Sequence, residues 1–402
     1  ILFSQTLLAQ ELAKFKVHFE SNRIDAPVSV SLDGINYNTD KGNLILYEIT
    51  ENGEKQVLSQ LESGHSARLW FIIKGESKKG TSKEFILKLG KKEQQTNSKV
   101  SLERNHKDLS LLVNEKPILN YRFATTFPPE GINPIFKRSG FIHPLWSPGG
   151  EVLSRIQPPD HYHHYGIWGP WTLTHIEDRK VDFWNLIAGE GTVKFAGFLS
   201  EAEGAVFSGF KALQQHVDFG AKGADQIAMN EILDVRAWNI GEDVWMVDYT
   251  TSLNSPLENG IMLNAYRYGG GIGFRATEKW HKDNCTVLTS DEKTRKDADG
   301  SYARWCIVEG ESKAGRSGIL FMSHPSNRMH PEPMRVWPLD ANRGRGDMYF
   351  EFVPIRHDDW KLEPKNNYTL KYRMIIFDGE IDAETAEKYW QAFAKPPVIS
   401  ME

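Results

Sequence analysis

Apolar and polar residues alternate along much of the chain, and this two-residue period is the feature that most limits what it can fold into. Successive side chains of a strand point to opposite faces, so the alternation predicts half-buried strands. Turn clusters such as Asp33-Gly34 and Asn52-Gly53 separate the runs, which is typical of an antiparallel sandwich. The runs in the first quarter of the chain are Phe15, Val17, Phe19; Val28, Val30, Leu32; Leu44, Leu46; Leu69, Phe71, Ile73; and Phe85, Leu87, Leu89.

The strand pattern continues beyond a polar stretch at residues 91–99, which we interpret as a linker. Strands are expected from Leu109 onward and again at residues 232–238, 244–253 and 368–377. Because 402 residues exceed what one hydrophobic core organises, two units are expected. The predicted fold class is mainly β, with a small immunoglobulin-like β-sandwich at residues 11–100 and a large antiparallel two-sheet sandwich at 101–397. One helix is predicted at 382–395, where an acidic cap precedes apolar residues at helical spacing.

The charge and the hydropathy of the sequence argue against nucleic acid and membrane as partners. The formal net charge of −5 comes from interspersed charged residues, so neither a nucleic-acid surface nor an acidic tail is indicated. A mean hydropathy of −0.47 and the lack of a long apolar run argue against a membrane span. The 12 tryptophans fit either sugar-stacking surfaces or a large β core, and both interpretations stay open.

The first residues and the cysteines bear on location. Residues 1–10 resemble the end of an apolar signal region without its basic start, and an amphipathic first strand is the alternative. We therefore expect an exported bacterial protein, periplasmic or secreted.

Cys285 and Cys306 are the only cysteines in the sequence. Export would allow them to form a disulfide, whereas cytosolic thiols would stay reduced. Their spacing does not fit a zinc finger.

Residues 141–175 hold five of the 13 histidines and are the densest concentration of chemically versatile side chains. Imidazole titrates near neutral pH and serves as acid, base or metal ligand. Pro158 and Pro159 disfavour a helix, so we expect an extended segment with His161 and His163 on one side and His164 on the other. A divalent metal on the His161 and His163 pair is an alternative, and it would need further ligands. Buried hydrogen bonding is the structural alternative.

Three other segments carry candidate groups. The DFW motif offers Asp182 beside Trp184. The glycine-rich run AYRYGGGIGFRAT contains Arg267 and Arg275, but it lacks the glycine order of a dinucleotide site. A proline-interrupted loop near residue 330 adds a further set, namely His324, Glu332 and Arg335.

These motifs resemble those of the PmoA-type family of exported bacterial proteins. The similar segments are HPLWSPGGEVLSRIQPPDHYHHYGIW, DFW, YGGGIGFRAT, SHPSN and LKYRMIIFDG. Tyr165 stands where members of that family commonly carry an arginine after the histidine pair. The resemblance implies a galactose-mutarotase-like sandwich whose concave face presents His, Arg, Trp and acidic residues to a sugar, in bacteria that degrade glycans. The methane-oxygenase label of that family does not fit, because a membrane monooxygenase needs spanning helices.

Together these features predict an exported carbohydrate-active enzyme, a glycoside hydrolase or a related sugar-cleaving or isomerising enzyme, with an oligosaccharide or glycoside as substrate. His163 or His164 would transfer the proton, with Asp160 or Glu332 as carboxylate partner. No cofactor is expected beyond the metal alternative. A non-catalytic carbohydrate-binding protein is the rival interpretation. The expected substrate-binding residues are Arg155, His143, His161, Trp168, Asp182, Trp184, Arg267, Arg275, His324 and Arg335.

Overall fold

The computed structural model describes residues 10–40, 42–91, 100–220 and 224–402. The predicted signal remnant, apart from Gln10, and the predicted linker, apart from Lys91, lie outside these ranges. Within them, no helix is long and apolar enough to span a membrane.

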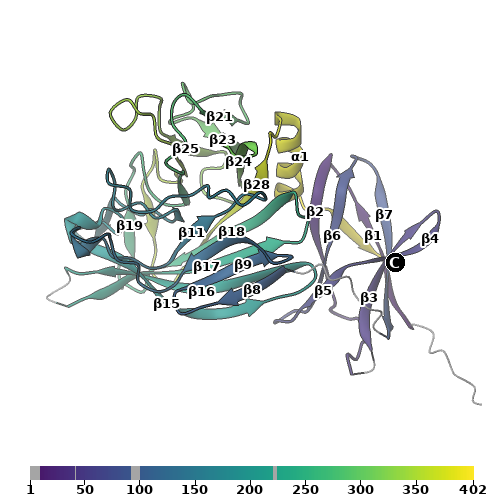
Figure 1. Cartoon of the computed structure of the whole chain (residues 1–402). Helices are drawn as coiled ribbons and strands as arrows, with labels where there is room; N and C mark the ends of the chain where they lie inside the picture. The colour runs from purple at the N-terminus through teal and green to yellow at the C-terminus, as the bar shows by residue number, and fades with distance from the viewer. Residues whose placement is uncertain (1–9, 41, 92–99, 221–223) are drawn as a thin grey trace, which may run out of the picture.

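The N-terminal strands form a small sandwich of two antiparallel sheets, coloured purple in Figure 1. Its core contains the alternating residues Phe15, Val17, Val28, Phe71 and Phe85, all at most 3% exposed. The first sheet has the order β29 (Val398–Met401), β1 (Gln10–His18), β7 (Ser82–Gly90), β3 (Asn43–Thr50), β4 (Gly53–Val57). The second has the order β2 (Arg23–Ser31), β6 (Arg68–Ser77), β5 (Ser59–Glu62). The last strand, β29, pairs with β1 and so brings the end of the chain back to the first unit.

The large unit is a second, antiparallel sandwich. Residues of both of its sheets interlock in one core; Phe352 stacks on Tyr372, for example, with ring centroids 5.7 Å apart. One sheet has the order β15 (Gly191–Ala202), β16 (Phe207–Asp218), β17 (Gln226–Trp238), β18 (Val244–Asn254), β28 (Tyr368–Asp378), β24 (Gly315–Ser323), β23 (Trp305–Ser312), β21 (Cys285–Thr289). The mainly β fold class, with a small sandwich before a large two-sheet sandwich, is confirmed.

The facing sheet and a short side sheet carry the loops of the candidate site. The facing sheet has the order β22 (Tyr302–Ala303), β25 (Glu332–Val336), β26 (Tyr349–Phe352), β20 (Ile272–Arg275), β12 (Ile167–Trp168), β11 (Phe141–Leu145), β10 (Lys116–Arg122), β9 (Asp108–Val113), β8 (Val100–Arg104). The side sheet has the order β14 (Arg179–Val181), β13 (Thr174–Ile176), β19 (Ile261–Leu263), β27 (Trp360–Leu362). Two short 3-10 helices, η1 (Pro134–Phe136) and η2 (Leu186–Ala188), lie in the loops.

The one α-helix of the described residues lies where the two sandwiches meet. This helix, α1 (Ala383–Ala394), falls within the range predicted from its cap and spacing. The Asp382 side chain accepts a hydrogen bond from the Thr385 backbone N–H at 2.7 Å and so caps the first turn. Trp390 and Phe393 pack into an apolar cluster that also contains Ile72 of the small sandwich. Figure 1 shows α1 beside β2, so the helix contributes apolar surface to both units.

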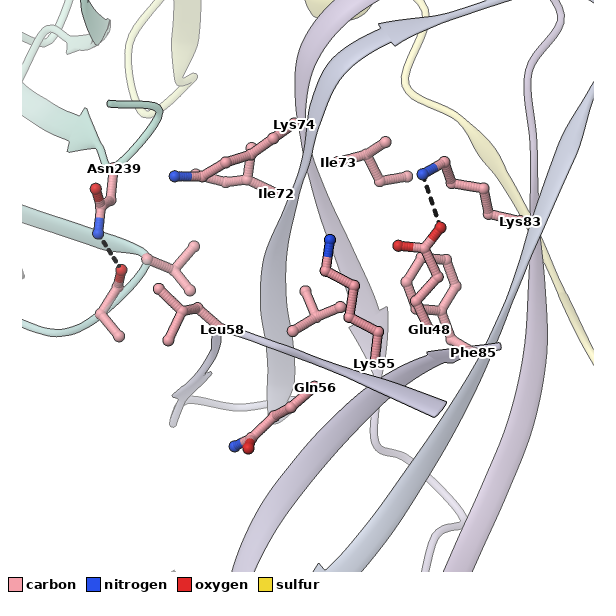
Figure 2. A pocket seen from close by; sticks show the side chains of 13 residues that line it. Glu48, Lys55, Gln56, Leu58, Ile72, Ile73, Lys74, Lys83, Phe85 and Asn239 are labelled. Atoms are coloured by element: carbon pink, nitrogen blue, oxygen red, sulfur yellow. Dashed lines mark hydrogen bonds and ion pairs between the residues drawn. The ribbon is translucent and has the colours of Figure 1, made fainter. Parts of the chain in front are cut away.

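A cleft of about 300 Å³ also lies at this junction (Figure 2). Its lining combines small-sandwich residues such as Ile72 and Phe85 with Val206 of the large sandwich. Glu48 and Lys83 form an ion pair of 2.7 Å at one side. The junction is therefore apolar at its base and charged at its rim.

Both cysteines are free and buried. Cys285 of β21 lies opposite Gly310, whereas Cys306 of β23 lies opposite Thr289, four register positions away. A disulfide between neighbouring strands needs closely opposed Cα atoms. The pairing that export would allow is therefore absent. Burial raises the pKa of the Cys285 thiol to about 12.

Candidate functional site

The histidine segment folds into two successive turns. Pro158 O accepts a hydrogen bond from the His161 N–H at 2.9 Å, and His161 O accepts one from the His164 N–H at 3.0 Å. Proline and the residues around it favour such turns as readily as extended chain. The prediction of an extended segment with His164 on the opposite side is therefore wrong.

The turns bring the three imidazole rings together. Ring centroids are 4.7 Å apart for His161 and His164, 4.9 Å for His163 and His164, and 5.4 Å for His161 and His163. Aromatic rings surround this group, and Trp184 stacks on His164 at 5.4 Å. The cluster is thus one packed unit of imidazoles and aromatic rings.

Burial separates the three histidines in their chemistry. His164 is 1% exposed, and burial lowers its pKa well below the ordinary value. Burial likewise lowers the pKa of His163 to about 3. Both rings are therefore neutral near pH 7, whereas the His161 side chain keeps 31% of its surface exposed. His163 is half-buried as His161 is, but of these two only His161 bonds to a carboxylate, so His161 is the one best placed to take a proton from a substrate.

His161 is held by a carboxylate. Its Nδ1 lies 2.7 Å from Asp160 Oδ2, and Arg275 Nη2 donates to the same oxygen at 2.9 Å. Partial burial acts to raise the pKa of Asp160, but the hydrogen bond from His161 and the charge of Arg275 outweigh it and lower that pKa. Because an ionised carboxylate only accepts, Nδ1 donates in this contact, and in a neutral ring Nε2 is then the acceptor. The pair thus has the arrangement of a carboxylate-oriented general base.

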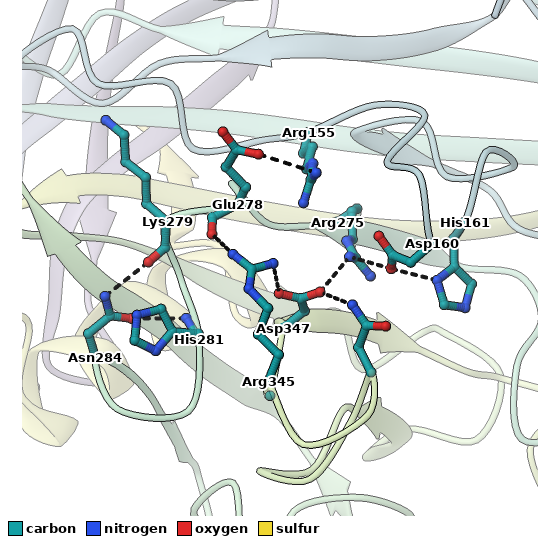
Figure 3. A network of polar contacts seen from close by, with 12 residues as sticks. Arg155, Asp160, His161, Arg275, Glu278, Lys279, His281, Asn284, Arg345 and Asp347 are labelled. Carbon is teal, nitrogen blue, oxygen red and sulfur yellow. Dashed lines mark hydrogen bonds and ion pairs between the residues drawn. The ribbon is translucent and has the colours of Figure 1, made fainter. Parts of the chain in front are cut away.

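A chain of alternating charges stands behind this pair (Figure 3). Arg275, 1% exposed, also donates to Asp347 at 3.1 Å and lies 4.7 Å from the centre of the Trp337 ring. Arg345 contacts Asp347 and the Glu278 backbone oxygen, and Arg155 pairs with the Glu278 carboxylate at 3.2 Å. Arg275 therefore positions Asp160 from within instead of facing a substrate.

The role of Asp347 was missed at the sequence level. It follows an arginine and a glycine and has the appearance of an ordinary turn residue. What distinguishes Asp347 is its hydrogen bond with Arg275, which lies 72 positions earlier in the chain and is brought close only by the fold.

The residues of the DFW motif are buried and pack against the histidine cluster. Asp182, 4% exposed, accepts from the Thr172 hydroxyl at 2.9 Å and from the Trp184 N–H at 2.9 Å. The Trp184 indole N–H donates to His163 O at 2.8 Å. Trp184 and Trp168 are 5% and 1% exposed. The expectation that these three residues contact a sugar is therefore corrected, since each is covered by its neighbours.

Glu332 does not join the histidines. It is fully buried and accepts from the Tyr372 hydroxyl and the Asn327 side chain, each at 2.9 Å, while Ser323 also contacts it. Burial raises its pKa to about 7. Glu332 begins β25, and Trp337, which packs on His161, directly follows the end of that strand. Five residues of extended chain span ~17 Å. The prediction that Glu332 is the carboxylate partner of the clustered histidines is therefore wrong.

The remaining predicted residues divide into two groups. Arg335 adjoins the cluster through Tyr268, to whose hydroxyl it donates at 3.1 Å, and the exposed Arg267 lies 5.4 Å from the same ring. His324 packs instead on Phe393 of α1 at 5.1 Å. His143 bonds to Ser154 Oγ at 2.9 Å, and burial lowers its pKa to about 4. Neither of these two histidines contacts the three clustered rings.

The alternative of a divalent metal on His161 and His163 would need further ligands. Across the part of the chain that the structure describes, no group of three or more His, Cys, Asp or Glu side chains is placed to hold an ion. His161 and His163 therefore stand as a pair only.

A family model matches residues 108–391, and its description is "Family of unknown function (DUF6807)". No curated protein matches the chain. The resemblance to the PmoA-type family and the predicted export stay predictions.

Three solved structures that are similar to this chain resemble it only distantly. An alpha-mannosidase from Enterococcus faecalis V583 is 9% identical, with 97% of this chain and 46% of that chain covered and a TM-score of 0.49. A protein of glycosyl hydrolase family 38 from Enterococcus faecalis is 9% identical, with 97% and 47% covered and a TM-score of 0.49. The heparan sulfate lyase HepC from Pedobacter heparinus is 7% identical, with 73% and 38% covered and a TM-score of 0.33. This chain spans less than half the length of each, and likenesses of this strength carry no argument about activity.

Proposed function

This chain belongs to the DUF6807 family, and we propose that it is a carbohydrate-active enzyme that transfers a proton through the Asp160–His161 pair. The observation that carries the proposal is the half-exposed His161 ring, held at Nδ1 by an ionised carboxylate that a buried arginine fixes from behind. Such an arrangement is suited to proton transfer.

The contacts of the cluster make His161 the proposed proton acceptor. When Nε2 takes a proton from a substrate, the imidazolium is stabilised by Asp160, which itself stays ionised. The neighbouring His163 and His164 are kept neutral by burial, so the new positive charge does not face two others. His161 and Asp160 are therefore the proposed catalytic residues. His163 and His164 pack against the His161 ring and support it.

The surroundings of the pair support a sugar as substrate. Tyr268 and the 37% exposed Tyr266 lie with ring centroids 5.9 Å apart, and Arg267 reaches over both. Aromatic faces beside hydrogen-bond donors are the usual elements of sugar recognition. Asp347, the other carboxylate that Arg275 binds, is 3% exposed and is engaged by Arg275 and Arg345, so it does not supply the open second carboxylate of two-carboxylate glycoside hydrolysis. We therefore favour a sugar-cleaving or isomerising reaction that begins with proton abstraction by His161.

A screen of oligosaccharides read by mass spectrometry tests this proposal. The wild-type chain is expected to convert at least one of them, and His161→Ala is expected to abolish the conversion. His65→Ala is the matched control, because His65 is exposed in the small sandwich, away from the pair. Conversion that survives in His161→Ala would refute the proposal. Binding without any conversion by the wild-type chain would establish a non-catalytic carbohydrate-binding protein instead.

A further inference from the structure

The large sandwich carries a second concave surface, a cleft of about 670 Å³ beside β15, the edge strand of its sheet. We call it the edge cleft and define it by Phe127, Arg138, Thr192, Lys194, Phe195 and Phe219. Its volume is in the range of ordinary ligand sites. None of its lining residues belongs to the Asp160–His161 pair or to the charge network of Figure 3.

The rim of the edge cleft is aromatic. Phe127 is 62% exposed, the largest exposed fraction among the large apolar side chains that the structure describes. Phe195 and Phe219 are half-buried, and the Lys194 amine lies 5.7 Å from the centre of the Phe219 ring. An exposed phenylalanine next to a cleft marks a contact surface, because water solvates its ring poorly.

The floor of the edge cleft is polar. Arg138 is 2% exposed and Thr192 is 8% exposed. Arg138 Nε and Thr192 Oγ1 have no hydrogen-bond partner among the residues placed by the structure, whereas buried polar groups ordinarily have one. These two atoms are shielded from solvent, and the Arg138 guanidinium turns inward, where it donates to Phe183 O at 3.4 Å and lies 5.4 Å from the centre of the Tyr165 ring. The contacts with a ligand therefore fall to the rim of the edge cleft.

The charges that line the edge cleft are unequal. Two exposed cationic side chains, Lys137 and Lys194, stand beside one carboxylate, Asp225, which lies 3.6 Å from Lys194. The exposed Lys137 forms no ion pair with the rest of the described chain. A ligand with negative charge complements this lining.

We propose that the edge cleft is a second carbohydrate-binding site, and that its ligand is a sugar chain containing uronic acid. Pyranose faces stack on Phe127 and Phe219, and the carboxylates pair with Lys137 and Lys194. The site does not depend on the proposed catalysis by His161, since binding there needs none of the catalytic residues.

Calorimetry of the whole chain with hexagalacturonate, and with the neutral xylohexaose, tests the proposal. Hexagalacturonate is expected to bind, more weakly as salt is added, and about fivefold more tightly than xylohexaose. Phe127→Ala is expected to weaken it about tenfold. Because Phe127 is exposed, this variant keeps the fold. Leu199→Ala is the matched control, since Leu199 is 54% exposed on the same edge strand but outside the cleft, and its affinity should equal that of the wild type.

The outcomes separate the two proposals. Absence of hexagalacturonate binding, or equal affinity in Phe127→Ala, would overturn the edge cleft as a sugar site. Tighter binding of xylohexaose would overturn the acidic ligand. His161→Ala should bind hexagalacturonate at the edge cleft as the wild type does; if that variant also keeps full turnover, the proposed catalytic function fails while the edge cleft stands.

Discussion

The guanidinium of Arg275 lies 2.9 Å from the carboxylate of Asp160, reaching it from the interior of the large sandwich. The two side chains are 1% and 20% exposed, so a buried cation holds a half-buried anion at the surface. The orientation of His161 therefore depends on a residue that a substrate does not touch.

Removal of that cation should destabilise the protein. Arg275→Met leaves Asp160 and the 3% exposed Asp347 without their shared partner, and we expect the free energy of unfolding to fall by about 3–5 kcal/mol. Urea unfolding measures this change. Arg267→Met, at an exposed arginine, should change it by less than about 0.5 kcal/mol. Equal effects of the two substitutions would contradict the positioning role of Arg275.

Loss of the Asp160 charge should impair catalysis more than binding. Asp160→Asn keeps the size of the side chain but no longer selects the Nδ1–H form of His161 or stabilises its protonated form. We expect kcat to fall by roughly 10²–10⁴-fold, with substrate affinity from calorimetry little changed. An undiminished kcat would show that His161 does not need this carboxylate.

Glu332 should make stability depend on pH. Its pKa is raised from 4.5 to about 7 in the folded protein, so the folded state retains a proton that the unfolded state releases between these values. Stability from this group is therefore lost as pH rises from about 4.5 to about 7, by up to about 3 kcal/mol.

The test of this pH dependence is urea unfolding at pH 5 and pH 8 for wild type and Glu332→Gln. The variant should lose less stability between the two pH values, because glutamine does not ionise. Glu130→Gln, at an exposed carboxyl, should behave as the wild type does. Identical pH dependence in Glu332→Gln and wild type would exclude the buried carboxyl as its source.

The cysteines should behave as buried thiols. Cys285 and Cys306 are 3% and 0% exposed, so a thiol reagent should label neither in the native state and both after unfolding. A reductant should leave the melting temperature unchanged. A fall in melting temperature with reductant would reveal a disulfide that the register of β21 and β23 opposes.

The period-two alternation determined much of the fold. The runs around Phe15, Val28 and Phe71 lie in β1, β2 and β6 with their apolar residues inward, and the residues predicted at 232–238, 244–253 and 368–377 lie in β17, β18 and β28. The cap at Asp382 likewise marked the start of α1. These features follow from local chemistry, because alternation and capping act between residues close in sequence.

By itself the sequence also marked residues 160–164 as the segment that carries chemistry, since clustered histidines are visible without a fold. Only the tertiary structure decided their roles. Arg275 meets Asp160 across 115 positions of sequence, and Glu332 is carried away from the cluster along β25. Burial makes His163 and His164 neutral, while the His161 side chain keeps 31% of its surface exposed and bonds to Asp160. Sequence pattern specifies which face of a strand is buried, whereas strand order, register and loop packing set the neighbours and the burial of each ionisable group.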